Sequence, residues 1–238
     1  DRRILPDAYH DVHVRLQGPV VNWLQTVFLE DWAYALDYRH PAMPQDFAAL
    51  LPPQDDGHAL AQIMASGPDS PLEAIHRVFV DACYAAHQRL WLATPYFVPT
   101  EAALLALTSA ALRGVDVRVL VPERSDSLLV TCAARSYFDE LLECGVKVYL
   151  YQKRMLHAKT MVVDDMLGMV GTANFDNRSF LLNFEVCAVL YSEELTQKLS
   201  EMFVQDLRQS RKVVRASEKQ PGYMALAEAT ARLLSPLL

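Results

Sequence analysis

A histidine, a lysine and an aspartate occur with the spacing H-x-K-x4-D, as His157, Lys159 and Asp164, and the run GTAN follows at 171–174. A neutral imidazole can attack phosphorus and form a covalent phosphohistidine. An ammonium group and a loop amide can hold the phosphoryl oxygens while negative charge develops on them. A second histidine is then needed to protonate the leaving alcohol and to activate the incoming one. These residues predict phosphodiester chemistry that requires no metal ion and no cofactor.

The segments around the motif are predicted to be strands. Residues 146–152 and 156–163 are apolar, rich in valine and bounded by turn residues, which is typical of strands. Side chains two positions apart on a strand share a face. His157 and Lys159 are therefore expected to point the same way.

A hairpin is expected to follow, with 167–171 as its return strand. The return brings Thr172 and Asn174, both predicted to bind substrate, back to the level of the histidine. Asp164 has the opposite parity and sits at the strand end. It belongs to the predicted catalytic motif, but we expect it to fix the turn or a neighbouring cation rather than share the face of the histidine.

The motif resembles the signature of the phospholipase D superfamily. The segments 94–122, 136–149 and 171–186 look like bacterial cardiolipin synthases of that superfamily, as does the closing run at 231–238. The resemblance implies transfer of a phosphatidyl group between two phosphatidylglycerol molecules, giving cardiolipin and glycerol. It implies phosphatidylglycerol and other anionic phospholipids as partners. It also implies a place on the cytoplasmic side of the bacterial inner membrane, peripheral or anchored by a segment outside this sequence.

An internal repeat relates 11–32 to 185–207. Each segment is an acidic residue, a short alternating apolar strand, a polar turn and an amphipathic helix, and one residue of insertion aligns Glu185 with Asp11. Such self-similarity indicates a duplicated unit. The resemblance implies that an acid at Glu185 orients a catalytic imidazole, and we count it among the substrate-binding candidates. The alternative is a surface acid at a strand end.

The fold class is predicted to be α/β, a phospholipase D-like layered mixed sheet flanked by helices on both faces. Helices are expected from Ser70 to about residue 88, at 101–113 and at 126–144. The first of these is expected to begin with a cap at Ser70 and a capping-box acid at Glu73.

The domain organisation follows from the repeat. Residues 1–36 are interpreted as the remnant of a first lobe, the proline-rich residues 37–58 as an inter-lobe linker, and 59–238 as a complete second lobe. The superfamily uses two motifs per active site, and the histidine of the first is usually the nucleophile. The second imidazole is expected from a missing N-terminal lobe or from a second copy in a homodimer. Residues 1–238 alone are expected to be inactive or nearly so.

Composition narrows the function further. The formal net charge is −7 and the pI is about 5.5, which disfavours a protein that tracks nucleic acid. The four cysteines are scattered and indicate buried thiols rather than a disulfide framework or a zinc site. The same motif would also serve a lipase, a phosphatidylserine synthase or a nuclease, since substrate choice lies in the loops. A non-catalytic module that keeps the fold is a further alternative.

Overall fold

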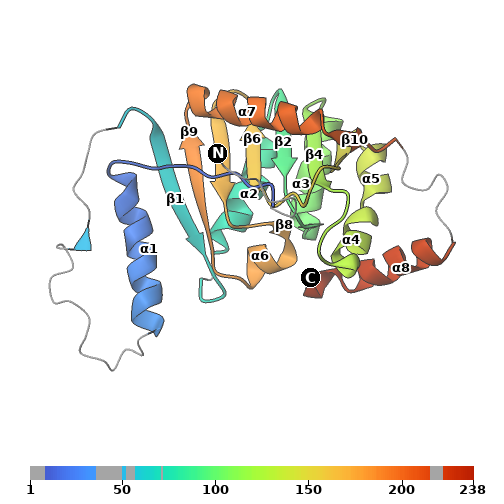
Figure 1. Cartoon of the computed structure of the whole chain (residues 1–238), viewed down its shortest axis with the longest axis horizontal. Coiled ribbons are helices and arrows are strands. Elements are labelled where there is room, and N and C mark those ends of the chain that lie inside the picture. Colours follow the sequence, from blue (N-terminus) through green and yellow to red (C-terminus); the bar gives the residue numbers. More distant parts are fainter. Residues whose placement is uncertain (1–8, 36–49, 52–56, 71, 215–221) are drawn as a thin grey trace.

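The centre of the protein is a mixed sheet of eight strands (Figure 1). From one edge of the sheet to the other, their order is β1-β9-β7-β6-β2-β4-β5-β10. The structure is a computed structural model that describes residues 9–35, 50–51, 57–70, 72–214 and 222–238. The strands of this sheet are β1 (Leu60–Ser66), β2 (Arg89–Ala93), β4 (Asp116–Pro122), β5 (Lys147–Tyr151), β6 (Thr160–Val163), β7 (Leu167–Gly171), β9 (Glu185–Tyr191) and β10 (Ser210–Lys212). Two short strands, β3 (Phe97–Val98) and β8 (Phe175–Asp176), pair separately.

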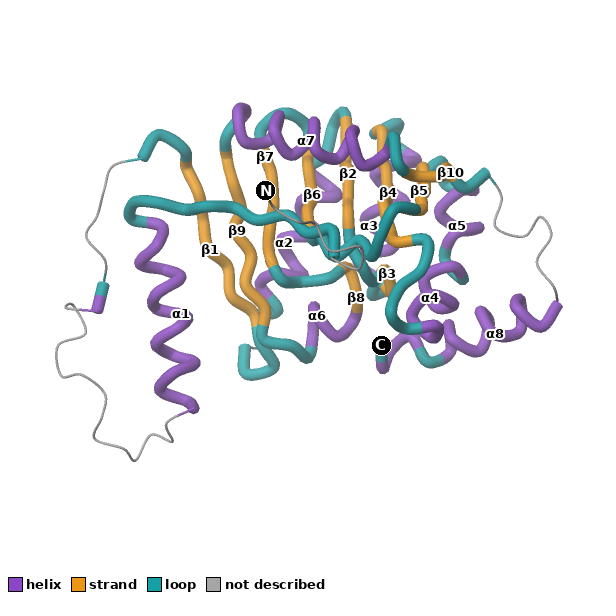
Figure 2. The backbone as a smooth tube through the Cα atoms, in the orientation of Figure 1, coloured by secondary structure: helices purple, strands orange, loops and turns teal. Residues whose placement is uncertain are grey.

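Helices cover both faces of the sheet, as the tube in Figure 2 shows. On one face lies α7, and α2 and α3 lie on the other. The helices are α1 (Val20–Ala35), α2 (Ala74–Ala85), α3 (Glu101–Leu112), α4 (Leu128–Arg135), α5 (Phe138–Glu143), α6 (Asn177–Leu181), α7 (Glu193–Leu207) and α8 (Gly222–Leu233), followed by a 3-10 turn at Ser235–Leu237. The predicted α/β fold with a layered mixed sheet is confirmed.

The direction of the strands brings several chain segments to one edge. β2, β4 and β5 are parallel, whereas β6 runs antiparallel to β2, with Ala93 paired to Thr160. The carboxyl ends of the parallel strands therefore lie beside the start of β6. We call this end of the strands the motif edge. The H-x-K residues lie there, immediately before β6.

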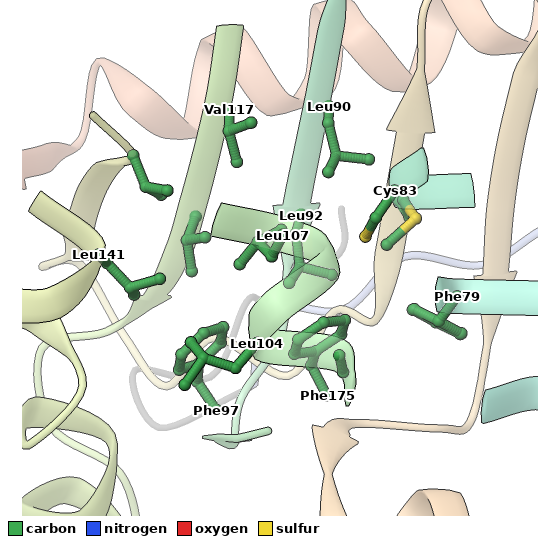
Figure 3. Packing of buried hydrophobic residues seen from close by; sticks show 14 of the residues in the cluster. Phe79, Cys83, Leu90, Leu92, Phe97, Leu104, Leu107, Val117, Leu141 and Phe175 are labelled. Carbon is green, nitrogen blue, oxygen red and sulfur yellow. The ribbon is translucent and has the colours of Figure 1, made fainter. Parts of the chain in front are cut away.

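The alternation of side chains along the strands builds two separate cores. Leu90 and Leu92 of β2 face a core with α2 and α3, whereas Trp91 faces the core under α7. Figure 3 shows the first core, in which Phe97 stacks on Phe175 with ring centroids 5.5 Å apart. Because both faces are covered, most positions of the central strands are apolar, as expected for strands buried on two sides.

The predicted strand at 156–163 is shorter than expected. It begins only at Thr160, and Leu156 instead forms an isolated parallel bridge with His10. The backbone N–H groups of His157 and Ala158 donate to the carbonyl of His10, at 2.7 and 3.1 Å. The hydrogen bonds that would extend β6 are therefore made to a segment nearly 150 residues earlier in the chain.

Two predicted helices also differ from the structure. The expected helix at 126–144 is two helices, α4 and α5, and the hydroxyl of Ser136 at the break donates to the carbonyl of Ala133 at 2.6 Å. Such back-bonding competes with helix continuation. The first helix begins at Ala74 rather than at Ser70, with Glu73 in the left-handed region at φ 46°.

Only part of the N-terminal repeat has the predicted secondary structure. Its helix is present as α1, which packs beside β1 (Figure 1). Its expected strand is an extended segment outside the sheet, in which Val12, Val14 and Leu16 pack against the α7 core. Most of the expected linker at 37–58 lies outside the described residues. The division into lobes therefore stays a prediction.

Candidate active site

His157 is held in place by the N-terminal segment. Besides the two bonds to the carbonyl of His10, the N–H of His10 donates to the carbonyl of Met155 at 2.8 Å. The imidazole of His10 contacts the carboxylate of Asp206 in α7 at 2.8 Å and stacks on Tyr151. This network fixes the backbone of residues 155–158 against a second chain segment at the motif edge.

The side chain of His157 contacts an acid from that same segment. Its Nδ1 lies 2.8 Å from Oδ2 of Asp11, and the ring of Tyr9 stacks on it at 5.3 Å. With Nδ1 engaged by a carboxylate, Nε2 is the nitrogen that can meet a substrate. The imidazole is 39% exposed, which leaves it accessible.

Electrostatics stabilise the ionised form of Asp11. Burial raises the pKa of this carboxyl, but the hydrogen bonds with His157 and with the N–H of Val12, and the nearby positive charges, outweigh it. The pKa of Asp11 therefore lies below its ordinary value of 3.8. A carboxylate beside Nδ1 fixes the tautomer and the orientation of the imidazole.

Lys159 stands two positions after His157 and is half-buried. Its Nζ donates to the carbonyl of His157 at 2.7 Å. Burial lowers the pKa of Lys159, opposed by the negative charges of Asp11, Glu185 and Asp176. An ammonium group in such a partly dry site interacts more strongly with an incoming phosphate than one in bulk water.

The return of the hairpin brings Thr172 to the same edge. The N–H of Gly171 donates to the carbonyl of Lys159 at 3.3 Å, so Thr172 lies at the level of the motif. The Thr172 hydroxyl donates to Oε2 of Glu185, and Asn183 donates to Oε1 at 3.2 Å. Glu185 is thus held at the start of β9, and its charge acts on Lys159.

Asn174 lies between these residues and a buried carboxylate. Its backbone N–H donates to the hydroxyl of Ser179 at 3.1 Å, and the N–H of Ser179 donates to the Asp176 carboxylate at 2.7 Å. Its Oδ1 is buried and makes no hydrogen bond within the described residues. The structure therefore brings Thr172 and Glu185 to the H-x-K residues, and Asn174 follows Thr172 two positions later.

Asp164 lies apart from this group. It follows β6 at the end opposite to His157 and adopts φ 50° in the hairpin turn. Its carboxylate accepts hydrogen bonds from the backbone N–H groups of His87, Gln88 and Arg89, at 3.0, 2.7 and 2.9 Å. The structure does not bring Asp164 into contact with His157 or Lys159.

Sequence reasoning missed two acids of the site, Asp11 and Asp176. The contact between Asp11 and His157 joins residues 146 positions apart, and the alignment of Asp11 with Glu185 was the signal that could have revealed it. Asp176 gave no comparable signal, since it reads as an ordinary helix cap.

Neither a metal-binding cluster nor a membrane-spanning helix occurs among the described residues. No group of three or more His, Cys, Asp or Glu residues in the described ranges could hold a metal ion. None of the helices that the structure describes is both long and apolar enough to cross a bilayer.

Comparisons with known proteins agree on the family. The family described as "Cardiolipin synthase, PLD-like domain" matches residues 80–207. Cardiolipin synthase of Geobacillus kaustophilus is 43% identical over 97% of this chain and 46% of its own length. Cardiolipin synthase of Alkalihalophilus pseudofirmus is 41% identical over 100% of this chain and 48% of its own length. The chain thus spans about half the length of the curated relatives it matches.

Solved structures show the same fold. Nuc from Salmonella typhimurium, a phospholipase D family member, has a TM-score of 0.56 and 22% identity over 66% of this chain and 99% of its own. Phosphatidylserine synthase of Haemophilus influenzae has a TM-score of 0.60 and 16% identity over 78% and 49% of the two chains. With its H-x-K site, its sheet and these relatives, the chain belongs to the cardiolipin synthase family of phospholipase D-like proteins.

Proposed function

We propose that the chain carries one half of the active site of a phosphatidyltransferase. The reaction is transfer of a phosphatidyl group between two phosphatidylglycerol molecules, giving cardiolipin and glycerol. The observation that carries the proposal is the contact of His157 Nδ1 with Asp11, which leaves Nε2 accessible beside Lys159. The high identity to cardiolipin synthases supports this choice of substrate over other phosphodiesters.

The proposed reaction has two steps with one covalent intermediate. In the first, an imidazole nitrogen bonds to phosphorus while the bond from phosphorus to the headgroup glycerol breaks. A second imidazole gives its proton to the glycerol oxygen, and glycerol leaves. In the second step a glycerol hydroxyl of another phosphatidylglycerol gives its proton to that imidazole. Its oxygen bonds to phosphorus, and the phosphorus–nitrogen bond breaks.

We assign His157 as the acid–base partner and the imidazole of another unit as the nucleophile. The carboxylate of Asp11 supports this assignment, because it stabilises the positive charge that an acid–base imidazole carries before it gives its proton to the leaving glycerol and again after it takes the proton of the incoming hydroxyl. Lys159 and the amide of Asn174 hold the phosphoryl oxygens. Thr172 and Glu185 complete the substrate side of the site, and no step is assigned to Asp164.

The second imidazole is proposed to come from another phospholipase D-like unit, either a preceding lobe of a longer protein or a second copy. The repeat supports this, since Glu185 aligns with Asp11, and Asp11 contacts an imidazole within this chain. Helix α1 supports it too. Phe28 of α1 aligns with Phe203 of α7, which covers the sheet by stacking on Trp91, yet Phe28 is 53% exposed.

The proposed setting is the cytoplasmic surface of the bacterial inner membrane, where anionic phospholipids supply both donor and acceptor. Full-length protein supplied with phosphatidylglycerol vesicles should form cardiolipin and glycerol in equal amounts. The His157→Ala variant should form neither while keeping its folded circular-dichroism spectrum. Absence of cardiolipin with the wild-type protein would refute the proposed substrate.

Two further measurements test the chemistry itself. Chelator treatment should leave turnover unchanged, and loss of activity restored only by a divalent ion would overturn the metal-free mechanism. Rapid quenching followed by peptide mapping should find the phosphorylated histidine outside this chain's motif. A phosphoryl group on His157 would reverse the assignment of the two imidazoles.

A further inference from the structure

Helix α6 lies between two of the candidate substrate-binding residues. It begins shortly after Asn174 and ends shortly before Glu185, and in Figure 1 it lies below β8, at the lower end of the sheet. Its inner side is buried, with Ser179 0% and Phe180 1% exposed. The outer side of this short helix therefore borders the motif edge directly.

The outer side of α6 combines one cation with apolar side chains. Residues three and four apart lie on one side of a helix, and here these are Arg178, Leu181 and Leu182. The N–H of Leu182 donates to the carbonyl of Arg178 at 2.8 Å, which continues the last turn. All three are exposed, as is Phe184 with 61% of its surface. We call these four residues the α6 face.

The α6 face is exposed but held in place. The ring of Phe184 lies against Gly67, where an added methyl group would come within 2.5 Å of it. The side chain of Asn177 donates to the carbonyls of Val98 and Ser235, at 3.1 and 3.0 Å, and so fixes the start of the helix. Neighbouring apolar side chains that are kept in water on a fixed backbone mark a surface for binding.

The chemistry of the α6 face fits the surface of an anionic bilayer. None of the ion pairs in the described part of the chain includes Arg178. A basic residue beside leucine and phenylalanine is typical of segments that lie in the plane of a membrane interface. The long stem of arginine lets its charge stay at the headgroups while its apolar neighbours enter the acyl region.

We propose that the α6 face docks on an anionic bilayer, with Arg178 among the headgroups and Leu181, Leu182 and Phe184 among the acyl chains. The inference rests on the proposed function in taking an anionic phospholipid as the ligand. Because Asn174 and Glu185 flank the face in the chain, docking brings the site to the layer of the lipid phosphates. A substrate phosphate can then reach the site while its acyl chains stay in the bilayer.

The first test asks whether the α6 face enters the acyl region. An environment-sensitive fluorophore is attached to Leu182→Cys in full-length protein, with Cys144→Ser added because Cys144 is a partly exposed thiol. Vesicles of phosphatidylcholine and phosphatidylglycerol that carry nitroxide-labelled acyl chains should quench this label. The matched label on Leu112→Cys, a position 71% exposed near the opposite end of the sheet, should not be quenched.

Three results of this test would overturn the proposal. They are a label at position 182 that the vesicles do not quench, equal quenching at position 112, and an emission at 182 that is already that of a buried site before vesicles are added. The last result would show that a second protein unit covers the face.

The second test changes the charge of the surface. Arg178→Gln should raise the lipid concentration for half-maximal quenching about fivefold, the effect of one basic residue near an anionic surface. Asp69 is an exposed acid beside Gly67, so Asp69→Asn should shift this concentration the other way. Both shifts should vanish on phosphatidylcholine alone. Shifts of the same sign, or shifts that persist on the uncharged vesicles, would refute docking on an anionic surface.

The third test compares two forms of the same substrate. Replacing both leucines, Leu181→Ser and Leu182→Ser, should lower the ratio of turnover on phosphatidylglycerol vesicles to turnover on dispersed short-chain phosphatidylglycerol by about 10-fold. Leu112→Ser should leave this ratio unchanged. An unchanged ratio in the double variant would contradict the proposal. Quenching needs no turnover, so a protein whose label at position 182 is quenched but that forms no cardiolipin would refute the proposed function alone.

Discussion

In the imidazole of His157, Nδ1 is held by a carboxylate and Nε2 is the nitrogen that can meet a substrate. Asp11 engages Nδ1 and Tyr9 covers part of the ring, while the backbone on both sides of the residue is bonded to His10. An imidazole held in this way has one tautomer and one orientation, so little reorganisation is left for the moment of proton transfer. The acid is therefore as much a part of the site as the histidine.

The Asp11→Asn variant tests this directly. The amide is neutral and can stabilise the wrong tautomer, so kcat should fall by about 100-fold or more, as replacing the acid of a histidine–aspartate pair does elsewhere. Stability should change little because both side chains are partly exposed. Steady-state turnover by full-length protein is the measurement, with the surface variant Glu194→Gln as control. Turnover within a few-fold of wild type would show that the contact does not matter.

Lys159→Met removes the ammonium group while keeping a flexible apolar stem. Loss of one electrostatic contact to the phosphoryl oxygens should lower kcat by about 100-fold or more. Removing a half-buried charge should not destabilise the fold, and the thermal midpoint is the check. If the variant turns over substrate at nearly the wild-type rate, the ammonium group lies outside the reach of the phosphate.

At the scale of elements, the candidate catalytic residues and the residue that stabilises the fold lie at opposite ends of the hairpin of β6 and β7. Its open end carries the H-x-K residues and Thr172, and its closed end carries Asp164. There the carboxylate of Asp164 accepts hydrogen bonds from three backbone N–H groups at the start of β2. The third member of the motif thus sets the register between the hairpin and the central strand. It can influence catalysis only by keeping β6 in place.

Asp164→Asn should therefore lower stability and spare the chemistry. The amide is uncharged and keeps only one accepting oxygen, so the bond from His87 to Oδ2 is lost and the bonds to the remaining oxygen weaken. Unfolding should therefore become easier by about 1–3 kcal/mol. Urea unfolding measures this, with the exposed neighbour Asp165→Asn as control. Activity lost at a temperature where the variant is fully folded would contradict it.

The same variant has a pH signature. Burial raises the pKa of Asp164, but the bonds from the N–H groups of Arg89, Gln88 and His87 outweigh it, so the pKa lies below 3.8. A lowered pKa means that the stabilisation is fully present above the ordinary value and is lost as the pH falls through the folded value. The stability difference between wild type and Asp164→Asn should accordingly shrink in acid.

Elements with strong local signals could be predicted from the sequence, and elements decided by distant contacts could not. The strand β7 and the helix α3 have their apolar runs and end signals within a few residues. The early end of α4 depends on the back-bonding of Ser136, and the late start of β6 depends on His10. Periodicity carries no information about such partners, and the same limit hid the contact between Asp11 and His157.

At the scale of the whole molecule, the proposed mechanism needs a second imidazole besides that of His157. Attack and proton transfer need two imidazoles, and only His157 stands in an H-x-K motif. The surface that would meet a second unit includes the aromatic side chains of α1, among them Trp23 and Trp32, which are 66% and 51% exposed. Exposed apolar surface of this kind marks an association site.

Residues 1–238 alone should consequently show little or no turnover of phosphatidylglycerol. The purified chain should be assayed over a concentration series beside the full-length enzyme, with its oligomeric state measured at each point. Association through α1 without the correct pairing of histidines should leave activity flat. Robust activity that rises with the dimer population and vanishes in His157→Ala would instead establish a composite site between two copies.

The way in which the N-terminal segment is attached predicts which contacts of the enzyme are lost first on warming. Residues 9–11 are joined to the motif edge by three backbone bonds, two contacts between a histidine and a carboxylate and two ring stackings, without a place in the sheet. Regions with so little support open at a lower free energy than the strands beside them. The amide protons of His157 and Ala158, bonded to His10, should exchange with deuterium faster than those of β6. On warming, the contact of Asp11 with His157 would be lost while the sheet is still intact, and cooling would restore the contact without refolding of the sheet.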